Sequence, residues 1–453
     1  MDITEFTIST FHNALRQQTT SCAVVVRTYL DRIAQYDPTL KTLVCINPNA
    51  LSIAAGKDEQ TKRFLQNDIP FPPLHGVPIV LKDNYATHDL PTSAGVKALQ
   101  CLRTSTDSEV VSRLRDAGAI VLAKANLHEF AFHGTTTSSL GGQTRNPYDL
   151  TRTPGGSSGG TAAALAANLG LIGCGTDTMN SLRSPASACG IVGFRPSQGR
   201  VSQRGIVPVS ETQDTAGPMG RTVEDVRTVY DVMTHECRGK GCERPSADGY
   251  KRIRIGVLEA YFSLEEKDPN LPKQLVAENA MVQKIVRNAL AVIQDADVEL
   301  VPINLAATSE WEPKTLLATA DTQPFEFKGC LEQFLQSPEI SYTPHRTLQS
   351  IAQSEEYDKD AVTEVFHASF IDPETYSRTS EAYQSRLSKI AELKQSVQRC
   401  FDENKLDALV YPHQRQLAIK IGPTVQPRRN GVLAALTGNP AICLPGKLLP
   451  SSA

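Results

Sequence analysis

Residues 145–196 read RNPYDLTRTPGGSSGGTAAALAANLGLIGCGTDTMNSLRSPASACGIVGFRP, with two serine clusters and a glycine-rich loop. An apolar run of small residues separates the clusters. Glycines and small residues gather where a backbone bends sharply or approaches a ligand closely, and a serine in such a place can attack a carbonyl group. The segment therefore predicts a catalytic core.

The same segment indicates alternating helices and strands. The glycine-rich loop precedes a helix of small residues, and a short apolar strand then leads into the second serine cluster. A further helix and strand follow. The expected elements are a helix over Thr161–Leu169, a strand over Leu171–Cys174, a helix over Pro185–Cys189 and a strand over Ile191–Phe194. This alternation is typical of an α/β sheet.

Upstream, an apolar strand over Val77–Leu81 ends at Lys82 and Asp83. A buried ammonium costs several kcal/mol unless it is paired or deprotonated. Lys82 is thus either a strand-end lysine paired with Asp83 or a buried base. The other elements expected on this side are a helix over 5–36, capped by Thr20 or Ser21, helices over Asn47–Phe64 and Asp107–Ala117, and a strand over Ala119–Lys124.

Downstream, residues 236–250 form the most obvious exposed break in the chain, and the α/β alternation continues beyond it. Residues 306–378 show weak periodicity and are expected to form helices over the site. The other elements expected here are strands over Ile253–Leu258, Val298–Ile303 and Leu406–Tyr411, a helix over Lys273–Ile293, and an amphipathic helix that includes Tyr383, Leu387, Ile390, Leu393, Val397 and Phe401.

The composition bounds the class of protein. The chain has 453 residues, 40% of them hydrophobic and 21% charged, with a net charge of −3. These values indicate a globular protein and give no electrostatic case for binding nucleic acid or an anionic membrane. The acidic N-terminal sequence lacks a secretory pattern, and no apolar run is long enough to span a bilayer, so we expect a cytoplasmic location. The 10 cysteines show no zinc-ligand spacing, so no metal is expected.

The glycine-rich loop has two other interpretations. Residues 156–160 match G-x-S-x-G, the nucleophile elbow of α/β-hydrolases, but that motif requires a buried strand directly before the serine, which this sequence lacks. Neither phosphate-binding glycine motif is present, and a glycine loop before a helix is by itself a weak signal for an anion site.

Three separated motifs together resemble the amidase signature family: GGSSGG at 155–160, GTDTMNSLRSPAS at 175–187 and PLHGVPIVLKDN at 73–84. The resemblance extends through RLRDAGAIVLAKANLHEF at 113–130 to GNPAICLPG at 438–446. It implies a single α/β domain over residues 1–453, with a mixed, twisted central sheet and helices on both faces. It also implies an enzyme that hydrolyses a carboxamide without metal or cofactor.

By motif position, the resemblance implies a Ser-Ser-Lys triad of Lys82, Ser157 and Ser181, with a cis peptide bond between Gly156 and Ser157. A serine hydroxyl is a poor nucleophile, and a neutral buried lysine could accept its proton through a second serine. Ser181 would then carry the acyl-enzyme. Ser158, Asp177 and Arg183 are expected to support the loops, the last two by hydrogen bonds and ion pairing with each other.

Backbone N–H groups of Thr178, Met179, Asn180 and Ser181 would form the oxyanion hole by family position. Most members have Gly-Gly where this chain has Met179-Asn180. Because asparagine tolerates positive φ, the hole is expected to be altered but functional, and Met179 is expected to narrow the pocket.

Family members usually continue past the segment 440–445 with a glycine-rich strand and a further strand and helix, over several dozen residues. This chain stops at Ala453, so a sheet edge beside Ala441–Leu444 is expected to lack a partner. The short tail and Met179-Asn180 leave open a second function, that of a catalytically weak or inactive amidase-like protein that binds a ligand or serves in a complex. A third possibility is the A subunit of a tRNA-dependent amidotransferase. The expected ligand is a small-molecule amide, and a homodimer is compatible with the sequence.

Overall fold

The computed structural model describes residues 3–4, 6–234, 253–264, 271–303, 309–423 and 425–446. The predicted exposed break at 236–250 lies outside these residues.

The central sheet has seven strands in the order β1-β4-β2-β5-β7-β6-β12. β2 runs parallel to both of its neighbours, and the other pairs are antiparallel. The mixed sheet is thereby confirmed. Its strands are β1 (Leu43–Ile46), β2 (Pro78–Lys82), β4 (Ile120–Ala125), β5 (Ile172–Asp177), β6 (Val192–Arg195), β7 (Thr215–Gly220) and β12 (Ala441–Cys443).

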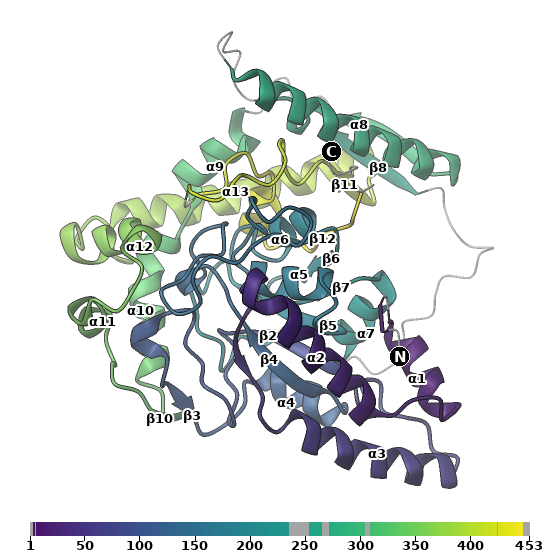
Figure 1. Ribbon diagram of the computed structural model, residues 1–453. Coiled ribbons are helices and arrows are strands. Elements are labelled where there is room, and N and C mark those ends of the chain that lie inside the picture. Colours follow the sequence, from purple (N-terminus) through teal and green to yellow (C-terminus); the bar gives the residue numbers. More distant parts are fainter. Residues whose placement is uncertain are drawn as a thin grey trace.

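Helices cover both faces of this sheet (Figure 1). On one face α5 (Gly159–Ala166) and α6 (Arg183–Cys189) pack together and share a cluster with Met219 of β7. On the other face α7 (Val223–Thr234) and α4 (Glu109–Asp116) share a cluster with Ala216 of the same strand. Side chains three positions apart on a strand point to opposite faces, so β7 contributes to both cores.

The N-terminal segment forms two helices, α1 (Ile8–Arg16) and α2 (Cys22–Leu40), so the predicted single helix over 5–36 is wrong in this respect. The interruption has a local cause: Gln18 has a φ of 55°, and Ser21 then caps α2 by accepting from the N–H of Val24. The predicted cap is confirmed, and α3 (Ala50–Gln66) matches the second predicted helix.

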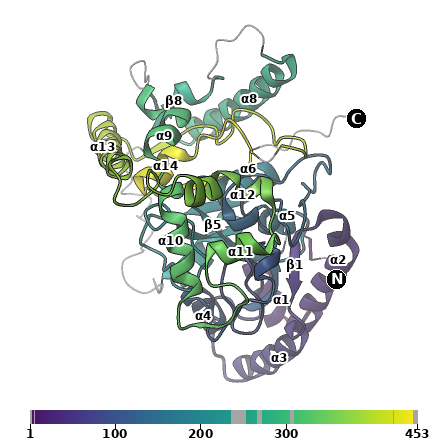
Figure 2. The same ribbon diagram turned by 90° about the vertical axis from the view of Figure 1, so that its left-hand side faces the viewer.

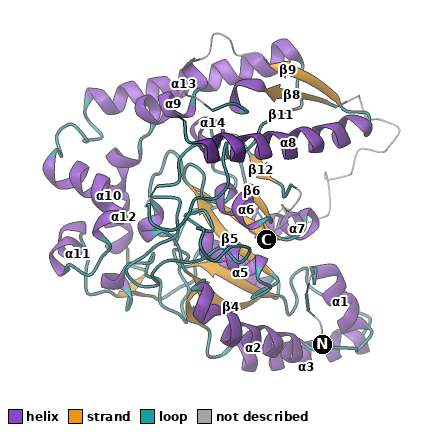
Figure 3. Ribbon diagram, turned by 45° about the horizontal axis from the view of Figure 1, so that its top comes forward, coloured by secondary structure: helices purple, strands orange, loops and turns teal. Residues whose placement is uncertain are grey.

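The strands of the second half form a separate parallel sheet of three, in the order β11-β8-β9. Figures 1 and 3 show it beside the long helix α8 and apart from the central sheet. The predicted strands and the two long helices are thus confirmed, but they add a second sheet. These elements are β8 (Arg254–Leu258), β9 (Glu299–Ile303), β11 (Ala408–Val410), α8 (Lys273–Asp295) and α13 (Glu381–Asn404).

The region of weak periodicity contains short helices, which lie together on one side of the molecule (Figure 2). They are α9 (Pro313–Ala320), α10 (Gln323–Leu335), α11 (Leu348–Ser354) and α12 (Lys359–Phe366). Between α10 and α11 lies the short strand β10 (Ile340–Tyr342), which pairs with β3 (Arg103–Thr104). The remaining elements are α14 (Val432–Thr437), a π-helical turn η6 (His367–Ile371) and the 3-10 turns η1 (Lys97–Leu99), η2 (Glu129–Ala131), η4 (Glu259–Tyr261) and η5 (Ser309–Trp311).

β12 is the last strand of the central sheet among the described residues, and it pairs with β6 alone. Ile442 and Leu444 are exposed beside that edge. None of the helices in the described ranges combines the length and apolar character required to cross a membrane.

Candidate active site

Lys82 ends β2 and is completely buried. Its Nζ donates to Ser157 Oγ at 2.8 Å and to Thr176 Oγ1 at 2.8 Å. Its neighbour Asp83 instead pairs with Lys124, at 3.0 Å. The alternative in which Lys82 pairs with Asp83 is therefore wrong, because successive residues along a strand point to opposite faces of the sheet.

Burial lowers the pKa of Lys82 to about 7, although the negative charges of Asp214 and Asp177 partly oppose this effect. An ammonium that loses its water is destabilised relative to the neutral amine. Near neutral pH, both protonation states of Lys82 are populated. A lysine in this condition can take up a proton and return it.

The loop that carries Ser157 approaches its neighbours too closely for larger residues. The Gly156–Ser157 peptide bond is cis. A Cβ on Gly156 would lie 2.8 Å from Thr136 Oγ1 and 2.9 Å from the carbonyl carbon of Gly134. The carbonyl of Ser157 accepts from the N–H of His128 at 3.1 Å. Close packing thus fixes the hydroxyl of Ser157 against Lys82.

Ser158 connects the two serine loops. Its N–H donates to the carbonyl of Ser181 at 3.2 Å, and its hydroxyl donates to the carbonyl of Thr176 at 3.2 Å. Ser181 itself is 6% exposed. Within the described part of the chain its hydroxyl makes no hydrogen bond, so the direct contact in the site is between Lys82 and Ser157.

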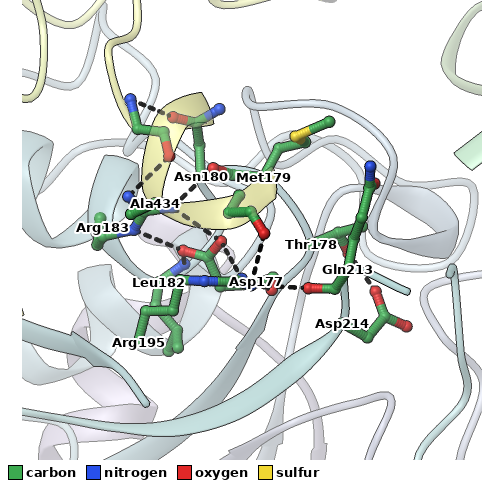
Figure 4. A network of polar contacts seen from close by, with 12 residues as sticks. Asp177, Thr178, Met179, Asn180, Leu182, Arg183, Arg195, Gln213, Asp214 and Ala434 are labelled. Atoms are coloured by element: carbon green, nitrogen blue, oxygen red, sulfur yellow. Dashed lines mark hydrogen bonds and ion pairs between the residues drawn. The ribbon is translucent and has the colours of Figure 1, made fainter. Parts of the chain in front are cut away.

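Asp177 organises the loop between Thr178 and Arg183 (Figure 4). The predicted ion pair with Arg183 is present: Nε lies 3.0 Å from Oδ2, and Nη2 lies 3.1 Å from Oδ1. Arg195 forms a second ion pair, at 3.0 Å from Oδ1. Burial raises the pKa of Asp177, but the two guanidinium groups outweigh it and hold the pKa well below its usual range. Arg195 was not predicted from the sequence, although a charged residue directly after an apolar strand was the available signal.

Asp214 is a second charged residue of the site that was not predicted from the sequence. Its carboxylate accepts from Thr178 Oγ1 at 2.6 Å and from the N–H groups of Val209 and Ser210, at 2.8 and 3.0 Å. Burial raises its pKa, although these hydrogen bonds and the charge of Lys82 oppose the effect. Asp214 therefore connects Thr178, at the start of the loop that carries Ser181, electrostatically to Lys82.

In the loop from Thr178 to Ser181, the carbonyl groups of Met179, Asn180 and Ser181 accept hydrogen bonds, whereas the N–H groups have no acceptor among the described residues. The carbonyl of Met179 accepts from Arg183 Nη2 at 2.7 Å, and that of Asn180 accepts from the N–H of Ser184 at 2.7 Å. In the described residues, the N–H groups from Thr178 to Ser181 donate to no protein acceptor. They remain available to a ligand oxygen.

The structure corrects the expectation for Asn180, whose φ is not positive; Met179 has no positive φ either. Instead, the side chain of Asn180 reaches across to α14, where Oδ1 accepts from the N–H of Gly431 at 3.1 Å. Met179 is buried in a hydrophobic cluster with Trp311 and Leu316. Its side chain therefore contributes to this hydrophobic cluster. That Met179 narrows the substrate pocket stays a prediction.

Two other groups have structural partners. His75 Nε2 contacts Thr61 Oγ1 at 2.8 Å, as expected for a histidine of the core. A possible metal-ligand set of His88, Asp89 and Asp107 lies together, but Arg115 is 2.6 Å from the first carboxylate and 3.1 Å from the second. This cation already supplies the charge that a metal ion would bring.

A mixed α/β fold in which a buried lysine is hydrogen-bonded to a serine beside a second serine loop defines the class of the protein, a hydrolase. A family model described as Amidase matches residues 24–449, and the chain belongs to this family. The predicted family is confirmed.

Three similar proteins illustrate the relationship. The "Probable amidase At4g34880" of Arabidopsis thaliana is 33% identical over 431 residues, which are 90% of this chain and 80% of that protein. The A subunit of the glutamyl-tRNA(Gln) amidotransferase of Thermoanaerobacter pseudethanolicus is 28% identical over 93% of this chain and 84% of its own length. The native peptide amidase of Stenotrophomonas maltophilia aligns with a TM-score of 0.78 and 29% identity over 98% of this chain and 90% of that one. The chain is thus an amidase-family hydrolase that acts on amides.

Proposed function

We propose that the chain hydrolyses the C–N bond of a carboxamide through an acyl-enzyme on Ser181, with Lys82 and Ser157 moving the protons. The observation that carries this proposal is the 2.8 Å contact between Lys82 Nζ and Ser157 Oγ, in which the lysine is fully buried. A neutral lysine beside a serine is a base that needs no histidine.

The reaction has two halves. Neutral Lys82 takes the proton of Ser157 as Ser157 takes that of Ser181, and Ser181 Oγ attacks the amide carbonyl. The C–N bond then breaks while the proton returns through Ser157 to the leaving nitrogen. Water next attacks the acyl group by the same transfers, releasing the carboxylic acid and restoring Ser181. The products are an acid and ammonia or an amine.

The negative charge on the amide oxygen requires donors that are already in place. The N–H groups from Thr178 to Ser181 are our candidates, and the ion pairs of Asp177 with Arg183 and Arg195 hold the loop that carries them. One such donor is worth about 2.7–4 kcal/mol, by comparison with the oxyanion-hole donor of subtilisin. No metal or cofactor enters these steps.

Labelling with a fluorophosphonate tests the nucleophile. The wild-type chain should be labelled at Ser181 and should release ammonia or amine from amides, whereas Ser181→Ala should do neither. Ser187→Ala is the matched control, because Ser187 is a serine of α6 whose hydroxyl accepts from Gln414. Full labelling of Ser181→Ala would exclude the assignment.

The relatives named as A subunits of glutamyl-tRNA(Gln) amidotransferases favour a second candidate function, in which the chain acts only within a complex. An inactive amidase-like subunit would also require partners. Purified chain that turns over simple amides alone, with activity lost in Lys82→Ala, would argue against both.

The cytoplasm is our proposed location, supported by the eight cysteines of the described residues, which are all free. Fractionation of cells that express the tagged chain would test it. A homodimer is retained as a prediction that light scattering can check.

A further inference from the structure

Arg429 is a cation without a counter-ion beside the catalytic loops. Within the described residues its guanidinium forms no hydrogen bond and no ion pair. The buried arginines around it do have carboxylate partners: Arg183 and Arg195 contact Asp177, and Arg415 contacts Glu312 at 3.1 Å. A partly buried guanidinium without an anion is costly, which indicates that another molecule supplies the anion.

The guanidinium lies against Gly134. A Cβ on Gly134 would be 2.4 Å from Arg429 Nη1 and 2.9 Å from its Cζ. Gly134 in turn packs on Gly156, where a Cβ would be 2.9 Å from the Gly134 carbonyl carbon. Since Gly156 precedes Ser157 in the chain, only one backbone segment separates the guanidinium from the catalytic serine loop. The missing side chain of Gly134 provides the room that this approach requires.

The surroundings of Arg429 are rich in nitrogen groups. His128 Nε2 and His413 Nε2 are buried without a hydrogen-bond partner in the described structure. Burial lowers the pKa of His128 well below its usual range, and the charges of His133, Arg429 and Lys82 lower it further. His128 is therefore within electrostatic reach of both the catalytic lysine and Arg429.

The carboxylates around these groups are already engaged. Burial lowers the pKa of Arg429 to about 10, and Asp177, which would raise it, is shared by two other arginines. Burial and the charges of Arg183 and Arg429 likewise lower the pKa of His413, with Asp177 opposing them. An incoming anion would find a site of positive potential beside the serines.

The backbone holds Arg429 in place. The backbone of Arg429 forms an isolated antiparallel β-bridge with that of Gln414, and the preceding Arg428 has a φ of 57°. The following residue, Asn430, is fully buried, and its side-chain amide donates to the carbonyls of Tyr261 and Pro412, both at 2.8 Å. A guanidinium on a fixed backbone loses less conformational entropy when a ligand binds.

We propose that Arg429 binds a carboxylate of the substrate, so that the enzyme acts on amides that carry a second, anionic end, such as monoamides of dicarboxylic acids. This inference rests on the proposed function. The planar guanidinium matches a carboxylate with two parallel hydrogen bonds, which selects the anionic substrate and orients its amide. Arg429 is thus a specificity-determining residue of the same site.

Protection from fluorophosphonate labelling tests this inference without knowledge of the natural substrate. Unbranched dicarboxylates of three to six carbons serve as ligands, and monocarboxamides without the acid group serve as neutral controls of equal length. We expect one or two dicarboxylates to slow labelling of the wild-type chain. In Arg429→Gln the dicarboxylate concentration for half protection should rise about 10- to 100-fold, as for loss of a charge-assisted hydrogen bond.

Three further variants sharpen the test. Arg428→Gln is the matched control, since this neighbouring guanidinium donates to Gln416 Oε1 at 3.4 Å, and protection should be unchanged. Arg429→Lys should retain part of the protection because the charge remains. Gly134→Ala should reduce protection by displacing the guanidinium of Arg429. It replaces Arg429→Gln in the test if that variant does not fold.

The outcomes separate the two proposals. A wild-type chain that is not labelled at Ser181 overturns the proposed function. A chain that is labelled but not protected by any dicarboxylate better than by its neutral control overturns the role of Arg429. Equal protection of the wild type and Arg429→Gln by a dicarboxylate also overturns the role of Arg429. For the matching monoamides, kcat/KM should fall about 10- to 100-fold in Arg429→Gln, and that of neutral amides should stay within about twofold.

Discussion

Replacing Lys82 with methionine should make the protein more stable and inactive. The fall of the lysine pKa from 10.5 to about 7 corresponds to about 5 kcal/mol of destabilisation of the ammonium form in the folded state. Methionine has a similar length and carries no charge, so the cost disappears in Lys82→Met. Loss of the hydrogen bonds to Ser157 and Thr176 offsets part of the gain, by about 1 kcal/mol for each bond.

The dependence on pH distinguishes this cause from better packing. Between pH 7 and 10.5 the unfolded chain binds a proton at Lys82 that the folded chain does not, so the free energy of unfolding of the wild type rises with pH. Lys82→Met lacks this term. The stability advantage of Lys82→Met should be largest below pH 7 and should shrink by about 2 kcal/mol between pH 7 and 9.

Urea unfolding of both proteins at intervals of half a pH unit measures this difference. The contributions of most other titrating groups to the free energy of unfolding cancel in the comparison, because these groups are present in both proteins. A difference that stays constant from pH 6 to 10 would refute the lowered pKa of Lys82. The same pKa requires kcat/KM of the wild type to rise as pH increases through about 7 and then to level off, since the neutral amine is the base.

Three other substitutions test the supports of the site. Asp177→Asn leaves two buried guanidinium groups without a carboxylate and should lower the free energy of unfolding by about 3–5 kcal/mol, measured by urea unfolding. Asn180→Ala removes the acceptor for the N–H of Gly431 and should cost about 1–3 kcal/mol, with slower fluorophosphonate labelling if this contact positions the oxyanion hole. Gly160→Ala places a Cβ 2.1 Å from the backbone oxygen of Asn126 and should lower the melting temperature, whereas the control Gly56→Ala meets no atom within 4 Å and should preserve or raise it.

Sequence patterns predicted the elements whose residues interact locally. Apolar runs located β2, β4 and β5. The association of Lys82 with Ser157, which lie 75 residues apart, was implied by the family resemblance and not by a local pattern. The ion pair of Asp177 with Arg183 was also predicted, since the two residues lie six positions apart on one loop. For the strands and for this ion pair, a short segment carries the whole signal.

The failures involve partners that lie far apart in the chain. Asp83 was a candidate for Lys82 because it is adjacent, yet strand geometry turns it to the opposite face, where Lys124 of another strand meets it. Arg195 reaches Asp177 from β6, and Asn180 reaches Gly431 across 251 residues. Such contacts depend on the order of strands and the packing of layers, which periodicity does not encode.

The distribution of buried charge connects these observations to function. Asp177 has two arginine partners, and Asp83 has Lys124, so these ion pairs hold loops in place. Among the described residues Lys82 Nζ has hydroxyl partners only, and burial lowers its pKa to a value at which it can exchange a proton. Arg429 has no partner among the described residues and retains its proton, because even a pKa of about 10 lies above neutral pH. A buried cation that can lose its proton is suited to catalysis, and one that cannot is suited to binding an anion. In both proposals the same lack of a protein carboxylate suits the residue to its role, Lys82 as the proposed base and Arg429 as the proposed contact for a charged substrate.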